Sequence, residues 1–179
     1  MGGAGRSVHT ASIGLDFRAT VSIPAAEILV LAERQSLKGL LLVLLDNAVK
    51  YTPRGGSVRL ALWSTEIHAV FEVTDSGIGI MPEDLPHIFE RFYRASNARY
   101  INADGSGLGL AIAKWIATAH HGTLETHSAS GEGTTFRLTL PLQAALSRGA
   151  SPDCEAAQFR SKPVRHGPRV CRELPDESG

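Results

Sequence analysis

Three polar side chains are spaced to share one face of a helix. Asn47, Lys50 and Tyr51 lie three and four residues apart at the end of an apolar stretch, and an α-helix turns by about 100° per residue. An amide oxygen can ligate Mg²⁺, which takes its other ligands from water and phosphates, and a lysine ammonium is a point charge for those phosphates. The group suits a metal-bound nucleotide. Taken alone, the triplet fits a solvated helix end better than a nucleotide site.

A carboxylate and two glycines follow an alternating segment. Asp75-Ser76-Gly77-Ile78-Gly79 comes directly after Phe71-Glu72-Val73. An ionised carboxylate at a strand end can accept a hydrogen bond from an exocyclic amine, and the two glycines let backbone and ligand approach closely. The motif is therefore a candidate reader of adenine. An ordinary Asp-Ser-Gly turn is the alternative.

A glycine-rich segment opens a further helical pattern. Gly105-Ser106-Gly107-Leu108-Gly109-Leu110 precedes an apolar run at residues 111–116. Free amides and the positive end of the helix dipole make such a position an anion cradle, which suits phosphates. The G-x-G-x-G spacing differs from the dinucleotide-binding G-x-G-x-x-G, and the chain has no G-x-x-x-x-G-K-[ST] phosphate loop.

Two aromatic residues precede this cradle. Phe89 and Phe92 lie three residues apart, and a polar stretch at residues 95–104 follows them. Buried aromatics can anchor a mobile loop, so the polar stretch is placed to act as a lid over the phosphates. The alternative is that both rings are ordinary core residues.

Hydrophobic periodicity indicates the elements that position these motifs. Strands are predicted at residues 15–21, 57–64, 67–75, 123–129 and 134–140, and helices at residues 33–51, after Pro82 and at 108–121. The second and third strands form one antiparallel pair, and the last two form another. Gly122 suits a left-handed stop after the last helix. The fold class is α+β: a two-layer sandwich with one mixed or antiparallel sheet and helices on one face.

Composition limits the domain organisation and the function classes. The chain has 179 residues with 18 basic and 18 acidic side chains, so no overall field recruits nucleic acid. No apolar run approaches the roughly 20 residues of a membrane span, and two cysteines near the C-terminus build no disulfide framework. Residues 1–12 are expected to be flexible, 13–142 to form the ordered domain and 143–179 to be a disordered tail. We expect a cytoplasmic location, with a parent protein that can be membrane-anchored.

The order and spacing of the motifs resemble one family, the catalytic and ATP-binding domain of bacterial sensor histidine kinases within the GHKL ATPase group. The matching stretches are Leu44-Leu45-Asp46-Asn47-Ala48-Val49-Lys50-Tyr51-Thr52-Pro53 (N box), Asp75-Ser76-Gly77-Ile78-Gly79 (G1 box), Phe89-Glu90-Arg91-Phe92-Tyr93 (F box), Gly105-Ser106-Gly107-Leu108-Gly109-Leu110 (G2 box) and the turn Gly131-Glu132-Gly133-Thr134-Thr135-Phe136. The resemblance implies a five-stranded mixed sheet with three helices over it.

The resemblance also implies residue roles. Asn47 would ligate Mg²⁺ and Lys50 would contact phosphate, and these two are the expected catalytic residues. Tyr51 would lie against the adenine, Asp75 would accept from its amino group, and Thr134 would support the adenine end. The expected ATP contacts are Asn47, Lys50, Tyr51, Asp75, Gly77, Gly79, Gly105, Gly107, Leu108, Gly109, Leu110 and Thr134.

Two departures from the family pattern shape the expected function. Val43 stands where many sensor kinases have a second Asn and hydrolytic relatives have a Glu base, so efficient ATP hydrolysis by this domain alone is not expected. None of the seven histidines is followed by an acidic residue, unlike the phosphoacceptor histidine of sensor kinases. The expected function is therefore that of the catalytic half of an ATP-dependent protein-histidine kinase. It would bind Mg-ATP and donate the γ-phosphate to a histidine on a separate helical hairpin, with a response regulator as indirect partner. The alternative is a degenerate nucleotide-binding regulator without phosphotransfer.

Overall fold

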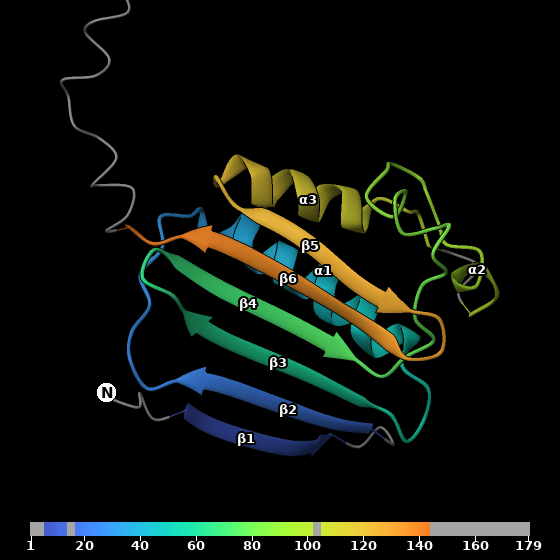
Figure 1. Cartoon of the computed structure of the whole chain (residues 1–179), viewed down its shortest axis with the longest axis horizontal. Coiled ribbons are helices and arrows are strands. Elements are labelled where there is room, and N and C mark those ends of the chain that lie inside the picture. Colours follow the sequence, from blue (N-terminus) through green and yellow to red (C-terminus); the bar gives the residue numbers. More distant parts are fainter. Residues whose placement is uncertain (1–5, 14–16, 102–104, 144–179) are drawn as a thin grey trace, which may run out of the picture. The chain divides into compact units, whose positions relative to one another are not determined.

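The computed structural model describes residues 6–13, 17–101 and 105–143. Its strands are β1 (Arg6–Ile13), β2 (Phe17–Pro24), β3 (Ser57–Ser64), β4 (His68–Asp75), β5 (Thr123–Ala129) and β6 (Gly133–Pro141). The helices are α1 (Arg34–Tyr51), α2 (Ala98–Ile101) and α3 (Gly109–Ala119). The strands form one sheet in the order β1-β2-β3-β4-β6-β5, in which only β2 and β3 run parallel. Helices α1 and α3 lie together on one face of this mixed sheet (Figure 1), so the predicted two-layer α+β sandwich is confirmed.

Helix α1 begins and ends where its sequence directs. Both carboxylate oxygens of Glu33 accept from backbone amides of the first turn, at 2.9 Å from Gln35 N and 2.6 Å from Ser36 N, which satisfies donors that the helix cannot. Thr52 is extended, with ψ of 120°, because a residue before a proline avoids the helical region. The helix thus stops with Lys50 and Tyr51 in its last turn.

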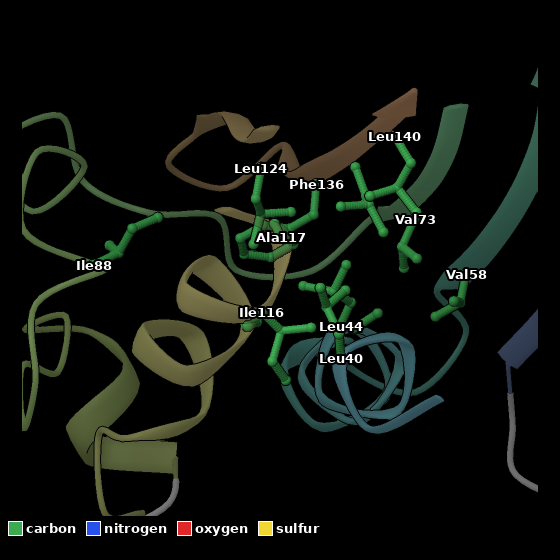
Figure 2. Packing of buried hydrophobic residues seen from close by; sticks show 13 residues of the cluster. Leu40, Leu44, Val58, Val73, Ile88, Ile116, Ala117, Leu124, Phe136 and Leu140 are labelled. Atoms are coloured by element: carbon green, nitrogen blue, oxygen red, sulfur yellow. The ribbon is translucent and has the colours of Figure 1, made fainter. Parts of the chain in front are cut away.

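One stripe of α1 is buried against the sheet. Leu40, Leu44 and Ala48 are fully buried, and their spacing of four residues puts them on one face of the helix. In Figure 2, Leu40 and Leu44 point toward Val73 and Leu140 of the sheet. Removing such apolar surface from water contributes about 25 cal/mol per Å². This packing fixes the rotation of α1 and holds Asn47 beside the buried stripe.

Helix α3 is held to α1 at its C-terminal end. The His120 ring lies between the two helices, with Nδ1 at 2.8 Å from Ile116 O and Nε2 accepting from Glu33 N at 3.0 Å. His121 takes the left-handed conformation (φ +57°), a position that the sequence favours for Gly122. Gly122 is needed for another reason, since a Cβ there would lie 2.5 Å from Thr139 O.

The sheet has an edge strand in addition to the five expected. Residues 6–13, which were predicted to lie mostly in a flexible N-terminus, pair antiparallel with β2 from Arg6↔Pro24 to Ile13↔Phe17, so that prediction is wrong for these residues. The segment is small and polar and gives little hydrophobic signal, but ladder hydrogen bonds come from the backbone and need no particular side chain. The predicted tail at 143–179 lies outside the described residues apart from Gln143.

The predicted short helix after Pro82 is a succession of turns. The amides of Asp84, His87 and Glu90 each bond to a carbonyl three residues back, at 3.0, 2.9 and 2.8 Å. Pro86 explains the difference, since it has no amide hydrogen and disfavours a helical conformation at the residue before it. The third helix of the described chain is instead the four-residue α2, which lies at the outer side of the loops near the N-terminal end of α3 (Figure 1).

Candidate functional site

A cavity of about 240 Å³ opens beside α1, the meeting ends of β4 and β6, and the start of α3. Most of the residues singled out from the sequence line it: Asn47, Lys50, Tyr51, Asp75, Gly79, Gly105, Gly107, Gly109, Leu110 and Thr134. Gly77 and Leu108 do not. Four stretches that lie far apart in the sequence therefore converge on one cavity.

Asp75 lines the cavity and uses one of its two carboxylate oxygens in the fold. Its side chain is 6% exposed, and Oδ1 accepts from Gly77 N at 2.8 Å and from Thr134 N at 3.3 Å. No described residue forms a hydrogen bond with Oδ2. Burial raises the pKa of Asp75, and the two backbone hydrogen bonds oppose that rise. The carboxylate is thus a fixed acceptor whose second oxygen is available to a ligand.

The glycines after Asp75 serve close packing of the backbone. A Cβ on Gly77 would lie 2.4 Å from Tyr51 O, and a Cβ on Gly79, whose φ is +66°, would lie 1.9 Å from Ala129 O. The amide of Ile78 also donates to Tyr51 O at 3.1 Å. Gly77 therefore contributes to the site indirectly, because it lets this loop pack against the end of α1.

The first turn of α3, beside the cavity, has no side-chain cap among the residues that the structure describes. The N-cap residue Leu108 supplies no side-chain hydrogen bond to the first turn, and Gly105, Gly107 and Gly109 line the cavity there. Gly107 has φ +69°, and a Cβ on it would lie 2.7 Å from Tyr93 O. Free N–H groups at the positive end of a helix are suited to an anion.

The segment before the cradle is anchored by Asp84 rather than by two aromatic rings. Asp84 is 5% exposed and accepts from Tyr93 Oη at 2.6 Å, Ser96 N at 2.9 Å and Ser96 Oγ at 2.8 Å. The hydrogen bond from Tyr93 lowers the pKa of Asp84. Phe89 packs against the core as expected, but Phe92 is 71% exposed. The part of the proposed lid at residues 102–104 lies outside the described residues.

A family model for histidine kinase-, DNA gyrase B- and HSP90-like ATPases matches residues 32–144, which include every motif that lines the cavity. The chain belongs to this family.

Its relatives in this family include proteins named sensor histidine kinases. The chain is 48% identical over 99 residues to the sensor histidine kinase RppB of Synechocystis, a match that covers 55% of this chain and 22% of that protein. It is 41% identical over 136 residues to the sensor-like histidine kinase SenX3 of Mycobacterium bovis, covering 76% of this chain and 32% of that protein. The match thus spans less than a third of either relative's length.

Solved structures show the same ATPase-family fold. A mycobacterial sensor histidine kinase, MprB, superposes with a TM-score of 0.63 and 36% identity, over 71% of this chain and 84% of that one. Full-length ShkA in complex with AMPPNP superposes with a TM-score of 0.59 and 29% identity, over 70% of this chain and 26% of that one.

Three further residues of this ATPase domain line or support the cavity and were not singled out from the sequence. Arg94 lines it near Tyr51; burial raises the pKa of Tyr51, and the charge of Arg94 opposes this. Asn97 also lines it, with Nδ2 donating to Gly79 O at 2.9 Å and a buried Oδ1 that has no hydrogen-bond partner among the described residues. Ser128, on β5, does not line the cavity, but its Oγ accepts from the amide of the lining residue Ile80 at 2.9 Å. Arg94 could have been found from the sequence, because it adjoins the F box. No sequence pattern around Asn97 or Ser128 indicates a role in the cavity.

The cavity fits a magnesium ion that is held mainly by a ligand. Asn47, whose side chain has an amide oxygen, lines the cavity, and no group of three His, Cys, Asp or Glu side chains in the described ranges could enclose a metal by itself. Mg²⁺ is commonly held by one or two side chains together with waters and phosphates. The donor set therefore suits magnesium bound to a nucleotide.

The same described residues include no helix long and apolar enough to cross a membrane.

Proposed function

We propose that this domain binds Mg-ATP in the cavity and donates the γ-phosphate to a histidine on a separate helical hairpin. The observation that carries the proposal is the convergence of Asp75, Asn47, Lys50 and the free amides of α3 on one cavity. In that order, these groups are a hydrogen-bond acceptor for the adenine, a magnesium ligand, a positive charge for the phosphates and a set of amides that can hold an anion. A response regulator would then take the phosphoryl group from the histidine.

The chemistry of the lining residues orients the nucleotide. The free Oδ2 of Asp75 receives the amino group of adenine, and Tyr51 lies against the base. The triphosphate extends to the amides at the start of α3, where Lys50 and Arg94 add positive charge. Bound Mg²⁺ would neutralise charge on the β- and γ-phosphates, with Asn47 as its protein ligand. The relative ShkA binds AMPPNP, a triphosphate analogue of this kind.

Transfer to a partner is favoured over hydrolysis. Val43 lines the cavity, and a Cβ on Gly109 would lie 3.2 Å from its Cγ1, so an apolar side chain faces the phosphate cradle. Asp46 also lines the cavity but is exposed, and three residues turn it about 300° around α1 from Val43. A positioned base that activates water typically contributes 10²–10⁴-fold, and the valine cannot supply it.

An apolar surface beside the phosphate end supports a docking partner. Ile112 and Trp115 are 48% and 69% exposed and follow Leu108 by four and seven residues, so they share one face of α3. The exposed Phe92 donates its amide to Gly107 O at 2.9 Å, next to the start of that face. An acceptor helix of the hairpin that covers this apolar surface would bring its histidine to the γ-phosphate.

The proposal is tested by phosphotransfer from labelled ATP. The chain is mixed with Mg²⁺, γ-labelled ATP and the separate hairpin domain of a related sensor kinase, and we expect an acid-labile label on the hairpin histidine. Asn47→Ala should abolish it. Gln35→Ala removes an exposed amide from the first turn of α1, outside the cavity, and should not. Labelling that persists unchanged in Asn47→Ala contradicts the proposed magnesium ligand.

A second candidate is a regulator that binds nucleotide without transferring phosphate. Val43 in the cavity wall and the lack of any histidine followed by an acidic residue favour it. Calorimetric titration of ATP with and without Mg²⁺ separates the two candidates. Tight binding that ignores Mg²⁺, together with no labelling of any supplied hairpin, indicates the regulator.

A further inference from the structure

The hydroxyl of Ser128 connects three parts of the adenine end of the cavity. Ser128 Oγ lies 2.7 Å from Gly133 O, 2.9 Å from Ile80 N and 3.0 Å from Thr134 Oγ1. Ile80 follows the glycine loop after Asp75, and Gly133 and Thr134 begin β6. One small side chain on β5 therefore has hydrogen-bonding partners both in the loop after Asp75 and at the start of β6.

The positions of the hydrogens follow from the chemistry of the partners. A carbonyl oxygen has no hydrogen, so the short contact with Gly133 O requires the single hydrogen of Ser128. The Ile80 amide can only donate, and it occupies one lone pair of Ser128 Oγ. The third contact then requires the hydroxyl hydrogen of Thr134. Ser128 is fully engaged, and Thr134 has no hydrogen left for the cavity.

Thr134 and Asp75 present acceptors to the same space. They are directly opposite each other in the β4–β6 ladder, and such cross-strand pairs have Cβ atoms about 4.5–5.5 Å apart on one face. Both are almost fully buried, at 7% and 6% exposed, and both line the cavity. With Oδ1 of Asp75 held by two amides, the pair offers Oδ2 and Thr134 Oγ1 to a ligand. Neither oxygen has a hydrogen to donate to that ligand while Asp75 is ionised, because the Thr134 hydrogen is directed to Ser128.

We propose that Ser128 is a specificity-determining positioning residue, which holds the Thr134 hydroxyl as an acceptor so that the pocket selects a 6-amino purine. The inference rests on the proposed binding of ATP and adds the reason for its base selectivity. An exocyclic amine offers two hydrogens to two acceptors. A 6-keto base would place the lone pairs of its oxygen against these two acceptors. With no hydrogen between them, no hydrogen bond forms to the base, and the buried acceptors stay unpaired.

Inosine triphosphate is the matched probe, because it differs from ATP at the 6-position and the adjoining N1 and lacks the 2-amino group of GTP. In Ser128→Ala the Thr134 hydroxyl is free to rotate and donate to the 6-keto oxygen. We expect the preference for ATP over inosine triphosphate, measured by calorimetry with Mg²⁺, to fall by roughly fivefold to tenfold, the scale of one hydrogen bond. Ser128→Thr keeps the hydroxyl and should retain the preference of the parent chain.

A double-variant comparison separates this role from a merely structural one. Thr134→Val removes the hydroxyl, so it should itself lower the preference, and adding Ser128→Ala to it should lower the preference no further. Thr134→Val alone tests the inference even if Ser128→Ala does not fold. Equal weakening of both nucleotides by Ser128→Ala, or an unchanged preference in Thr134→Val, overturns the inference while ATP binding stands. A parent chain that binds neither nucleotide overturns the proposed function itself.

Discussion

At the scale of single residues, the site depends on buried polar groups with one side engaged by the fold and one side free. Asp75 uses Oδ1 for two backbone amides and leaves Oδ2 to a ligand, and Thr134 divides its hydroxyl in the same way. Burying such groups is costly unless each is paired. In the proposed function a nucleotide would supply the missing partners, so its binding would be coupled to base identity.

Replacing the free oxygen of Asp75 tests this arrangement. In Asp75→Asn the amide oxygen can still accept from Gly77 N and Thr134 N, while a nitrogen donor replaces Oδ2. We expect ATP to bind more weakly by about 1.5–3 kcal/mol, the worth of a charge-assisted hydrogen bond, and inosine triphosphate to lose much less. Glu83→Gln, which removes a charge from an exposed position outside the cavity, is the control in the calorimetric titration. Equal affinity of the parent chain for ATP and GTP would contradict a reading role for Asp75.

The raised pKa of Asp75 predicts how ATP affinity depends on pH. The ionised carboxylate is the form that accepts from the amine, so affinity is complete above the pKa and is lost as the pH falls through it. Because burial raises that pKa, the loss should begin at a higher pH than for an ordinary aspartate, which titrates at about 3.9. Titrations at decreasing pH should show the loss in the parent chain, and Asp75→Asn should lack it. An affinity that stays constant until ordinary aspartates titrate would be the contrary result.

At the scale of elements, the sequence predicts well what hydrophobic periodicity and capping determine. The expected strand at residues 57–64 coincides with β3 (Ser57–Ser64), and the expected helix at 33–51 is α1 with its cap at Glu33. These elements bury one regular face, which is the property that periodicity detects. The G2 box likewise opens α3 on the cavity.

The sequence predicts poorly what depends on contacts between distant segments. The edge strand β1 has few apolar residues and is defined by its pairing with β2. The anchoring of Tyr93 and Ser96 by Asp84, and of Ile80 by Ser128, joins residues that no local pattern relates. Arg94 was within reach of sequence reasoning, because it adjoins the F box, but its place in the cavity wall depends on how the preceding turns fold.

The backbone at Gly107 predicts an effect on both binding and stability. A valine there would carry a β-branched side chain at φ +69° with its Cβ 2.7 Å from Tyr93 O. We expect Gly107→Val to cost about 1–3 kcal/mol of unfolding free energy through strain and to abolish ATP binding by closing the cradle. Gly39 on α1 is a matched control, since a Cβ there meets no heavy atom within 4 Å. Thermal melts should show Gly39→Ala to be more stable by about 0.5–1 kcal/mol, with ATP affinity kept. Unchanged ATP binding in Gly107→Val would place the phosphates elsewhere.

At the scale of the whole molecule, the domain provides one cavity for the proposed nucleotide and leaves exposed apolar residues near it. The described sheet face and helices form a single core, whereas Phe92, Ile112 and Trp115 contribute exposed apolar area next to the phosphate end. Large exposed apolar residues gathered in one place are characteristic of an interaction surface. The proposed function assigns that surface to the acceptor hairpin.

Removing the largest of these side chains separates docking from nucleotide binding. Trp115 does not line the cavity, so Trp115→Ala should keep the ATP affinity of the parent chain. Loss of a large aromatic contact at an interface commonly costs about 2 kcal/mol or more, so transfer to the hairpin histidine at limiting hairpin concentration should fall by roughly tenfold or more. The exposed Leu29, which precedes α1, provides Leu29→Ala as a control. Equal loss of transfer in both variants would argue against docking on α3.

The most direct test of the account is a crystal structure of the chain with Mg²⁺ and a non-hydrolysable ATP analogue. We expect the 6-amino group to lie within hydrogen-bonding distance of Asp75 Oδ2, Mg²⁺ to be ligated by Asn47, and the triphosphate to lie on the amides at the start of α3. A base bound away from Asp75, or a triphosphate bound away from α3, would contradict the central claim that the converging motifs hold one nucleotide.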